Sequence, residues 1–276
     1  MSALASGQLT TGRARGRGTL AVLPHSAYLT ARLLRSTGRQ PAFVVIMLIQ
    51  PMIWLLLFGQ LFKRVVELPG FATGSYIDFL TPGVVVMTVL FTSGWAGMAF
   101  IDDMERGVMD RMLSSPVSRM AMMISSVANQ AVTIVVQGLI VVVVGLLLGA
   151  SFSGGVLGVA VMLLAAVLLA AAFASLSNGM ALIVRTQESL IGFSTMLTLP
   201  LSFLSSAMMA REAAPAWIQT VSSYNPVDWT VVASREALSA NPDWSAVLPR
   251  LGGLAAVALV AIWLATRAFR SYQRSL

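Results

Sequence analysis

Long apolar stretches alternate with short polar segments along almost the whole chain. Six of these stretches reach about 20 mostly apolar residues, the length that a helix needs to cross the roughly 30 Å hydrocarbon layer of a membrane. They run from Pro41 to Phe62, Leu80 to Ile101, Ala121 to Leu148, Val156 to Val184, Ser189 to Met209 and Leu248 to Thr266. Because lipid offers no partners to unpaired backbone groups, the pattern predicts six membrane-spanning helices.

The polar remainder predicts the organisation of an all-α integral membrane protein. Residues 1–18, rich in Gly and Arg, are predicted to form a disordered basic tail, residues 19–40 an N-terminal interfacial helix, and residues 41–276 a six-span transmembrane domain. On the interfacial helix, Arg32, Arg35 and Arg39 share one face. This face suits either an anchor on anionic lipid headgroups or a contact with a cytoplasmic partner.

Composition and charge placement agree with this class and add an orientation. Charged residues make up 11% of the chain and the mean hydropathy is +0.82, whereas soluble proteins carry about 25% charged residues. With a cytoplasmic N-terminus, thirteen of the 18 Lys and Arg residues fall on inside segments. Because positive residues concentrate on the cytoplasmic side, both termini are predicted to be cytoplasmic. The net charge of +7 therefore needs no nucleic-acid partner.

Few residues could support catalysis. The chain has no cysteine, and His25, the one histidine, precedes the first span, so a metal site, a disulfide and a rhomboid-type serine–histidine pair are not expected. The one lysine, Lys63, lies outside any G-x-x-x-x-G-K-[ST] phosphate-binding loop. These residues predict a non-enzymatic membrane protein without a cofactor of its own.

The loop between the second and third spans carries a dense run of charge. It reads DDMERGVMDRMLSSPVSRM over residues 102–120. On a helix, Ile101, Met104 and Val108 form an apolar stripe, and Asp103 and Arg106 lie on a charged one. Such a segment would lie on the membrane plane with its charges facing the cytosol, although a solvated loop with incidental amphipathicity would look the same.

Two motifs in the chain resemble a known family. The stretch ERGVMDRMLSSPVSR resembles E-R-G-T-L-E-R-L-x-x-[ST]-P-x-[ST]-R of the type 2 ABC exporter permeases, which include daunorubicin/doxorubicin resistance permeases. Downstream, YNPVDWTVVASREAL resembles that family's segment between spans five and six. Val108 replaces the commoner Thr and Asp110 the commoner Glu, and neither change alters the charge pattern.

The resemblance implies a coupling mechanism. In that family, the loop after the second span is a coupling helix that docks on a separate ATPase subunit, and the interfacial helix touches the same subunit. ATP and Mg would then be bound by that subunit, in two copies, beside a second copy of this chain or a sister permease. The matched coupling positions are Glu105, Arg106, Gly107, Asp110, Arg111, Leu113, Ser115, Pro116 and Arg119.

Polar side chains within two spans suggest where a substrate passes. In the predicted fifth span, a hydroxyl stripe consists of Ser194, Thr198, Ser202 and Ser205. Small hydroxyls in spans serve either close helix packing or a pathway, and the two remain open here. The resemblance implies that the first and fifth spans face the dimer axis, which adds Gln50 and Trp54 to the candidate path. A stripe in the third span, from Ser126 to Gln137, more readily suits packing.

The long segment between the fifth and sixth spans has two interpretations. Its aromatic residues suit an interfacial cap on the membrane surface. The resemblance implies instead a pair of short helices that dip into the outer leaflet and close the exit, with a candidate outer gate at Trp217, Asn225, Pro226 and Arg235.

The sequence therefore predicts a permease subunit of an ATP-driven ABC exporter in a prokaryotic plasma membrane. No span carries a charge near its middle, which argues against a proton-driven antiporter and favours an amphiphilic drug, secondary metabolite or lipid as cargo. A lipid-linked glycan exporter is the alternative within transporters. An ATP-independent channel or structural protein is the alternative outside them.

Overall fold

A computed structural model gives the fold of the chain. It describes residues 30, 49–61, 76–109, 111, 119–207, 211 and 214–272, and of residues 119, 120 and 269–272 only the backbone. The predicted tail over residues 1–18, the three arginines of the predicted interfacial helix and most of the loop after Met109 lie outside the described residues.

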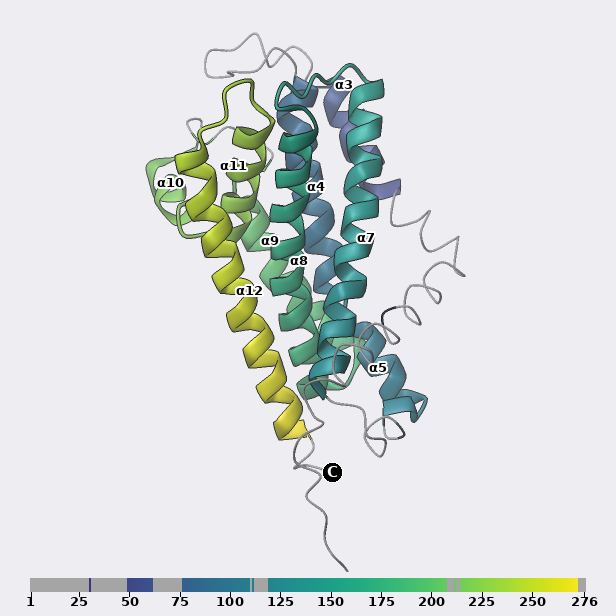
Figure 1. The fold of residues 1–276 in the computed structure, drawn as a ribbon. Coiled ribbons are helices and arrows are strands. Elements are labelled where there is room, and N and C mark those ends of the chain that lie inside the picture. The colour runs from purple at the N-terminus through teal and green to yellow at the C-terminus, as the bar shows by residue number, and fades with distance from the viewer. Residues whose placement is uncertain are drawn as a thin grey trace, which may run out of the picture.

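All the elements in the described part of the chain are helices, which confirms the predicted class. In chain order they are η1 (Trp54–Phe58), α3 (Gly59–Leu61), α4 (Tyr76–Gly94), α5 (Met98–Glu105), α7 (Arg119–Leu147), α8 (Gly155–Val184), α9 (Gln187–Phe203), α10 (Ala216–Ser222), α11 (Pro226–Leu238) and α12 (Trp244–Tyr272). The π-helical turn η1 and α3 end an apolar helical stretch, Ile49–Leu61. The helices form one bundle, with α5 and the last turns of α12 at one end and α11 toward the other (Figure 1).

Four helical stretches are long and apolar enough to cross a membrane. They are Tyr76–Glu105, Ala121–Leu147, Gly155–Val184 and Trp244–Ala268, and they match the predicted second, third, fourth and sixth spans. The predicted fifth span is α9, whose 17 residues extend only about 25 Å at 1.5 Å per residue. Of the predicted first span, residues 49–61 are described. The six-span arrangement is therefore confirmed for four spans only.

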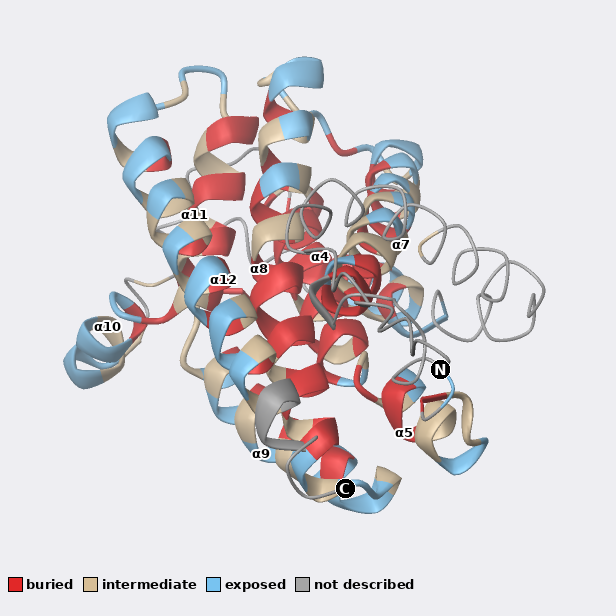
Figure 2. Ribbon diagram, turned by 60° about the horizontal axis from the view of Figure 1, so that its bottom comes forward, coloured by how far each residue is buried: buried red, intermediate tan, exposed pale blue. Residues whose placement is uncertain are grey.

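Helix α8 lies at the centre of the bundle and contacts α4, α7, α11 and α12 (Figure 2). Its inward positions carry small residues, among them Ala166, Ala170 and Ala174, which are fully buried. A Cβ added at Gly158 would lie 2.3 Å from the carbonyl oxygen of Ala237 on α11. Small residues let helix backbones approach closely, which is how helices associate where lipid is the solvent.

The predicted second span is interrupted rather than continuous. Helix α4 ends at Gly94, and the chain turns through residues 95–97 before α5. The carbonyl oxygen of Gly94 accepts hydrogen bonds from the hydroxyls of Ser177 on α8 and Ser194 on α9, each 2.6 Å long. The Gly97 N–H donates to Ser177 Oγ over 3.0 Å. The polar groups left by the broken helix are thus satisfied by two neighbouring helices, which hold the break in place.

Polar side chains of α7 bind its neighbours inside the bundle. The Gln130 amide donates to the hydroxyls of Ser93, at 3.1 Å, and Thr92, at 3.3 Å, on α4. The Asn178 amide on α8 donates to Ser126 Oγ at 2.9 Å. All these side chains are buried. Ser126 and Gln130 of the predicted third-span stripe therefore serve helix packing rather than a pathway.

Candidate functional site

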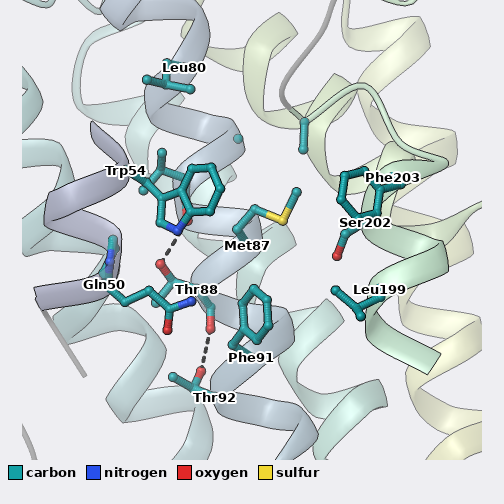
Figure 3. Close-up of a pocket in the computed structure, with 14 residues that line it drawn as sticks. Gln50, Trp54, Leu80, Met87, Thr88, Phe91, Thr92, Leu199, Ser202 and Phe203 are labelled. Atoms are coloured by element: carbon teal, nitrogen blue, oxygen red, sulfur yellow. Dashed lines mark hydrogen bonds between the residues drawn. The ribbon is translucent and has the colours of Figure 1, made fainter. Parts of the chain in front are cut away.

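A cavity of about 120 Å³ lies between the Ile49–Leu61 helix, α4 and α9. Three candidate path residues line it: Gln50 and Trp54 from the first helix and Ser202 from α9 (Figure 3). The full lining is Gln50, Pro51, Trp54, Leu80, Gly83, Val84, Met87, Thr88, Phe91, Thr92, Leu199, Ser202, Phe203 and Ala207. Residues 150 positions apart in sequence are therefore brought together at one site.

The cavity wall is apolar. Its hydroxyl groups donate to backbone carbonyls of their own helices: Thr88 to Val84 O at 2.8 Å, Thr92 to Thr88 O at 2.7 Å, and Ser202 to the α9 backbone at 2.7 Å. No charged side chain is among the lining residues of this described region. The hydroxyl oxygens can accept a hydrogen bond, and the rings and alkyl groups around them suit an apolar guest.

Exposed apolar side chains lie on the two helices that flank the cavity. Phe203, at the end of α9, is 75% exposed, and Leu199 one turn before it is also exposed. Ile49 and Ile53 are exposed on the facing helix. The Trp54 and Phe58 rings stack with their centroids 4.6 Å apart across η1. The cavity therefore opens onto a surface suited to lipid or to another helix rather than to water.

The hydroxyl stripe of α9 divides into two parts. Ser194 donates to Gly94 O, and Thr198 is 3% exposed beside the same glycine, where an added Cβ would lie 3.5 Å from its Oγ1. Ser202 reaches the cavity, whereas Ser205 donates to Ser202 O over 2.7 Å. Ser194 and Thr198 thus lie in the α4–α9 contact, and only Ser202 among the four lines the cavity.

The predicted coupling segment begins in α5. Glu105, Arg106 and Arg111 are exposed, and Gly107 has a φ of 65°, a left-handed conformation that glycine adopts without strain. Arg119 begins α7. Asp110, Leu113, Ser115 and Pro116 lie outside the described residues, as do Arg32, Arg35 and Arg39.

Contacts on both faces of α5 tie it to the helix that lines the cavity. Gln187, the first residue of α9, donates to Asp102 Oδ1 over 2.8 Å. Ile101 and Met109 are buried in an apolar cluster with Leu190 of α9. The charged segment and α9 are therefore joined by one hydrogen bond and by packed side chains.

At the other end of the bundle, Asn225 joins α9 to α11. Its Nδ2 donates to the carbonyl oxygens of Leu201, at 2.8 Å, and Leu204, at 3.0 Å. Its Oδ1 accepts a backbone N–H from the first turn of α11, which begins at Pro226. Trp217 of α10, in contrast, is 63% exposed.

Arg235 binds α11 to the start of α4. Its guanidinium lies 3.6 Å from the centroid of the Phe79 ring and donates from Nε to Phe79 O at 3.3 Å. Its Nη2 donates to the Ala207 carbonyl at 3.1 Å. Asp228, two turns earlier on the same face of α11, accepts the Ser206 N–H at 2.8 Å. Arg235 and Asp228 therefore bracket the turn that ends α9.

The sequence named Arg235 as a candidate gate residue and placed Asp102 in the charged loop, but it did not reveal their partners, Phe79 and Gln187. Asp102 and Gln187 are 85 positions apart, and Phe79 and Arg235 are 156 apart, so no local pattern connects either pair. Gly94 and Gly97 offered a signal, because small residues in an apolar stretch often mark a close helix approach.

Comparisons with known proteins agree with this architecture. A sequence model of the family described as ABC-2 type transporter matches residues 26–238. The chain is 29% identical over 259 residues to the daunorubicin resistance ABC transporter permease protein DrrB1 of Streptomyces coeruleorubidus, covering 91% of this chain and 90% of that protein. It is 29% identical over 204 residues to a Cyanophora paradoxa protein named as a transport permease, covering 74% and 70%.

A further relative is a Mycobacterium tuberculosis protein named as a doxorubicin resistance ABC transporter permease, DrrC. It is 21% identical over 231 residues, covering 84% of this chain and 83% of that protein. The resemblance inferred from the two motifs is confirmed. Since the family match extends over most of the chain and the described helices are those of a membrane protein, this chain belongs to the ABC-2 type transporter family.

Proposed function

We propose that this chain is the permease half of an ATP-driven exporter in a prokaryotic plasma membrane, with both termini cytoplasmic. Its 276 residues contain no phosphate-binding loop, so ATP and Mg²⁺ would be bound by two copies of a separate ATPase subunit. The second permease would be another copy of this chain or a sister permease. The Ile49–Leu61 helix and α9 would belong to the first and fifth of six spans.

The observation that carries the proposal is the path of contacts from α5 to the cavity. Exposed Glu105 and Arg106 offer charges of both signs to a partner, which would set the register of docking. Displacement of α5 would act on α9 through Asp102 and Gln187. Ser202, near the far end of the same helix, lines the cavity. Movement of α5 by the ATPase subunit would thus shift α9 and change the shape of the cavity.

The predicted interfacial helix would complete this contact. Arg32, Arg35 and Arg39 are placed on one face by their spacing. We infer that this face meets the ATPase subunit or the anionic headgroups beside it. The remaining coupling positions, from Asp110 to Arg119, would continue the docking surface that Glu105 begins.

The chemistry of the cavity supports an amphiphilic cargo. Rings of Trp54, Phe91 and Phe203 and the Met87 side chain line it, and hydroxyl oxygens supply weak acceptors. A volume of about 120 Å³ is below the roughly 300 Å³ of a typical ligand site, so the cavity would have to widen to admit a cargo of drug size. A narrow apolar seam favours a drug, secondary metabolite or lipid over a lipid-linked glycan, whose sugars would need a wide polar channel.

The segment between α9 and α12 would close the exit. Asn225 and Arg235 both hold the turn after α9 by donating to its carbonyls, so movement of α11 would be passed to α9. With Pro226 at the start of α11 and Trp217 exposed on α10, these residues form the proposed outer gate.

Reconstitution with a candidate ATPase subunit tests the proposal. The full chain, tagged and coexpressed with a candidate ABC ATPase subunit from the same organism, should copurify with that subunit, and daunorubicin should stimulate ATP hydrolysis in proteoliposomes. An ATPase subunit with its P-loop lysine replaced provides the control. Cargo flux through the permease alone, at the rate of the complex, would instead establish an ATP-independent channel.

A further inference from the structure

A second pocket, separate from the cavity and from α5, lies between α11 and the first turns of α12. Its volume is about 380 Å³, within the range of about 300–1,000 Å³ typical of ligand sites. Arg211, Arg250, Trp229 and Asp228 are among its lining residues. Most of the lining residues belong to α11 and to the first turns of α12, and these elements lie at the end of the bundle away from α5 (Figure 1).

The aromatic wall of this pocket is held in place. The Trp229 Nε1–H donates to the Ser223 carbonyl at 2.7 Å. On the other side, α12 approaches through Gly253, where an added Cβ would lie 3.0 Å from the indole ring. A fixed indole between two helices forms a rigid wall, and any residue larger than glycine at position 253 would press on it.

Two guanidinium groups contribute positive charge to the pocket. Arg250 donates from Nη1 to the Ala246 carbonyl at 2.7 Å, and Arg211 donates from Nη2 to the Gln219 carbonyl at 2.7 Å. Each guanidinium has five N–H donors, so these backbone bonds orient the groups and leave further donors for a ligand. Planar guanidinium forks match the oxygen geometry of phosphate.

The carboxylates near the pocket are engaged with the protein. Asp228 is 2% exposed and accepts the Ser206 N–H at 2.8 Å. Asp243, exposed before α12, accepts the N–H and the hydroxyl of Ser245, at 2.9 and 2.6 Å, and lies in the electrostatic field of Arg250. Among the pocket residues, two cations and one buried anion leave a single net positive charge.

The surroundings of the pocket are those of a membrane interface. Helix α12 is one of the four apolar stretches long enough to cross a membrane, and the pocket lies at its first turns. Exposed Trp217, Trp244 and Leu248 lie nearby in sequence, and Tyr224 is 79% exposed. Aromatic side chains gather at the headgroup level, where arginines near a span's end extend toward phosphates.

We propose that this pocket binds the phosphodiester of a glycerophospholipid headgroup, from the leaflet on the α10–α11 side. Arg211 and Arg250 donate to the phosphate oxygens, and the Trp229 ring packs against the glycerol carbons. The single negative charge of a phosphodiester balances the net charge of +1 on the lining residues. The pocket shares no lining residue with the cavity or the coupling segment, so its binding of lipid can be measured without an ATPase subunit or a cargo.

Lipid titration of the delipidated full chain, followed by native mass spectrometry, tests this site. The probes are dioleoylphosphatidylglycerol, dioleoylglycerol with the same acyl chains and no phosphate, and inorganic phosphate. Phosphatidylglycerol should form a saturable 1:1 adduct, dioleoylglycerol should not, and inorganic phosphate at equal concentration should not displace the lipid. Arg250→Gln should weaken the adduct about tenfold, the loss expected for a charge-assisted hydrogen bond.

Matched variants separate this site from general adsorption. Arg250→Lys should retain more affinity than Arg250→Gln, and Arg211→Gln should weaken binding independently. Arg267→Gln removes an arginine at the other end of α12, 4.5 Å from the Trp263 ring centroid, and should leave the adduct unchanged. Equal binding of dioleoylglycerol, full displacement by inorganic phosphate, or equal losses at positions 250 and 267 would each overturn the proposal. Unchanged helicity by circular dichroism identifies folded variants.

Discussion

Gln187 donates a 2.8 Å hydrogen bond to the carboxylate of Asp102 and so joins the first residue of α9 to α5. Ile101, next to Asp102 in the chain, and Leu190, three residues after Gln187, are fully buried in one apolar cluster. The hydrogen bond is therefore backed by packing. Two segments that α7 and α8 separate in the chain are thus joined by a hydrogen bond and by packed side chains.

Breaking that link should reduce coupling between ATP hydrolysis and export. Gln187→Glu replaces a donor with a carboxylate facing Asp102, and like charges in contact repel. We expect cargo-stimulated ATP hydrolysis to fall about five- to tenfold, which corresponds to losing about 1–1.4 kcal/mol, while the ATPase subunit still copurifies. Glu188→Gln changes an exposed neighbour and should have no effect; equal losses in both variants would rule out a role for the hydrogen bond.

Charge reversal in the coupling segment should act at the partner instead. Arg106 is exposed, so Arg106→Glu should leave the folding of the permease intact. We expect it, and Asp110→Arg, to uncouple hydrolysis from export by placing like charges opposite the ATPase subunit. The measurement is cargo efflux per ATP hydrolysed in proteoliposomes. Normal efflux and normal assembly in both variants would contradict the coupling role.

Two serine and threonine positions of α9 should respond differently to the same substitution. Ser202→Leu adds a side chain inside the cavity and should reduce cargo export severalfold with little change in melting temperature. Thr198→Leu forces the larger side chain against Gly94 and should lower the free energy of unfolding by about 1–3 kcal/mol, the usual cost of overpacking. Export assays and thermal melting in detergent separate the two. If Thr198→Leu reduced export and Ser202→Leu reduced stability, the pathway would lie along Thr198 instead.

The break between α4 and α5 should tolerate no side chain at Gly97. An added Cβ there would lie 2.4 Å from the Ser177 carbonyl oxygen, so Gly97→Ala must displace a backbone, at a cost of at least about 1–3 kcal/mol. Gly192 on α9 has nothing within 4 Å of an added Cβ. Gly192→Ala should therefore be neutral or slightly stabilising, because alanine favours helix. Similar melting temperatures for the two variants would show that the close contact is not rigid.

Loss of Arg235 should loosen the exit end. Arg235→Gln removes the contact with the Phe79 ring and the charged donors to the Phe79 and Ala207 carbonyls. We expect about 1–3 kcal/mol of destabilisation, seen as faster hydrogen exchange in α11 and at the start of α4. Arg235→Lys keeps the charge without the planar guanidinium, so its hydrogen-exchange rates should lie between those of the unsubstituted protein and those of Arg235→Gln. Exchange unaltered by Arg235→Gln would exclude it as a gate residue.

Sequence patterns predicted the long helices better than the short ones. The third and fourth spans match α7 and α8 because their uninterrupted apolar runs admit no other structure in lipid. The second span was predicted as continuous because Gly94, Trp95 and Gly97 are themselves apolar and mark no polar boundary. The predicted fifth span was too long, because α9 ends at Phe203. The turn that follows is held by hydrogen bonds to Asn225 and Asp228, which lie outside the predicted span.

The candidate site was partly predictable for a similar reason. Gln50, Trp54 and Ser202 meet at the cavity. They were candidates because the family resemblance implied that the first and fifth spans face the same axis. Helical spacing alone placed Ser194 and Thr198 in one stripe with Ser202. A stripe about three turns long, however, extends from the contact with Gly94 of α4 to the cavity. Which hydroxyl reaches the cavity depends on where α4 ends.

The order of apolar and charged residues was enough to predict the membrane class, the long spans and the charged segment between two of them, because the preference of a residue for lipid or water does not depend on its neighbours in the fold. The break at Gly94, the Asp102–Gln187 hydrogen bond and the Arg235–Phe79 contact became visible in the packed helices alone. Each of these depends on directional contacts between residues distant in sequence, and such contacts exist only after the helices have packed.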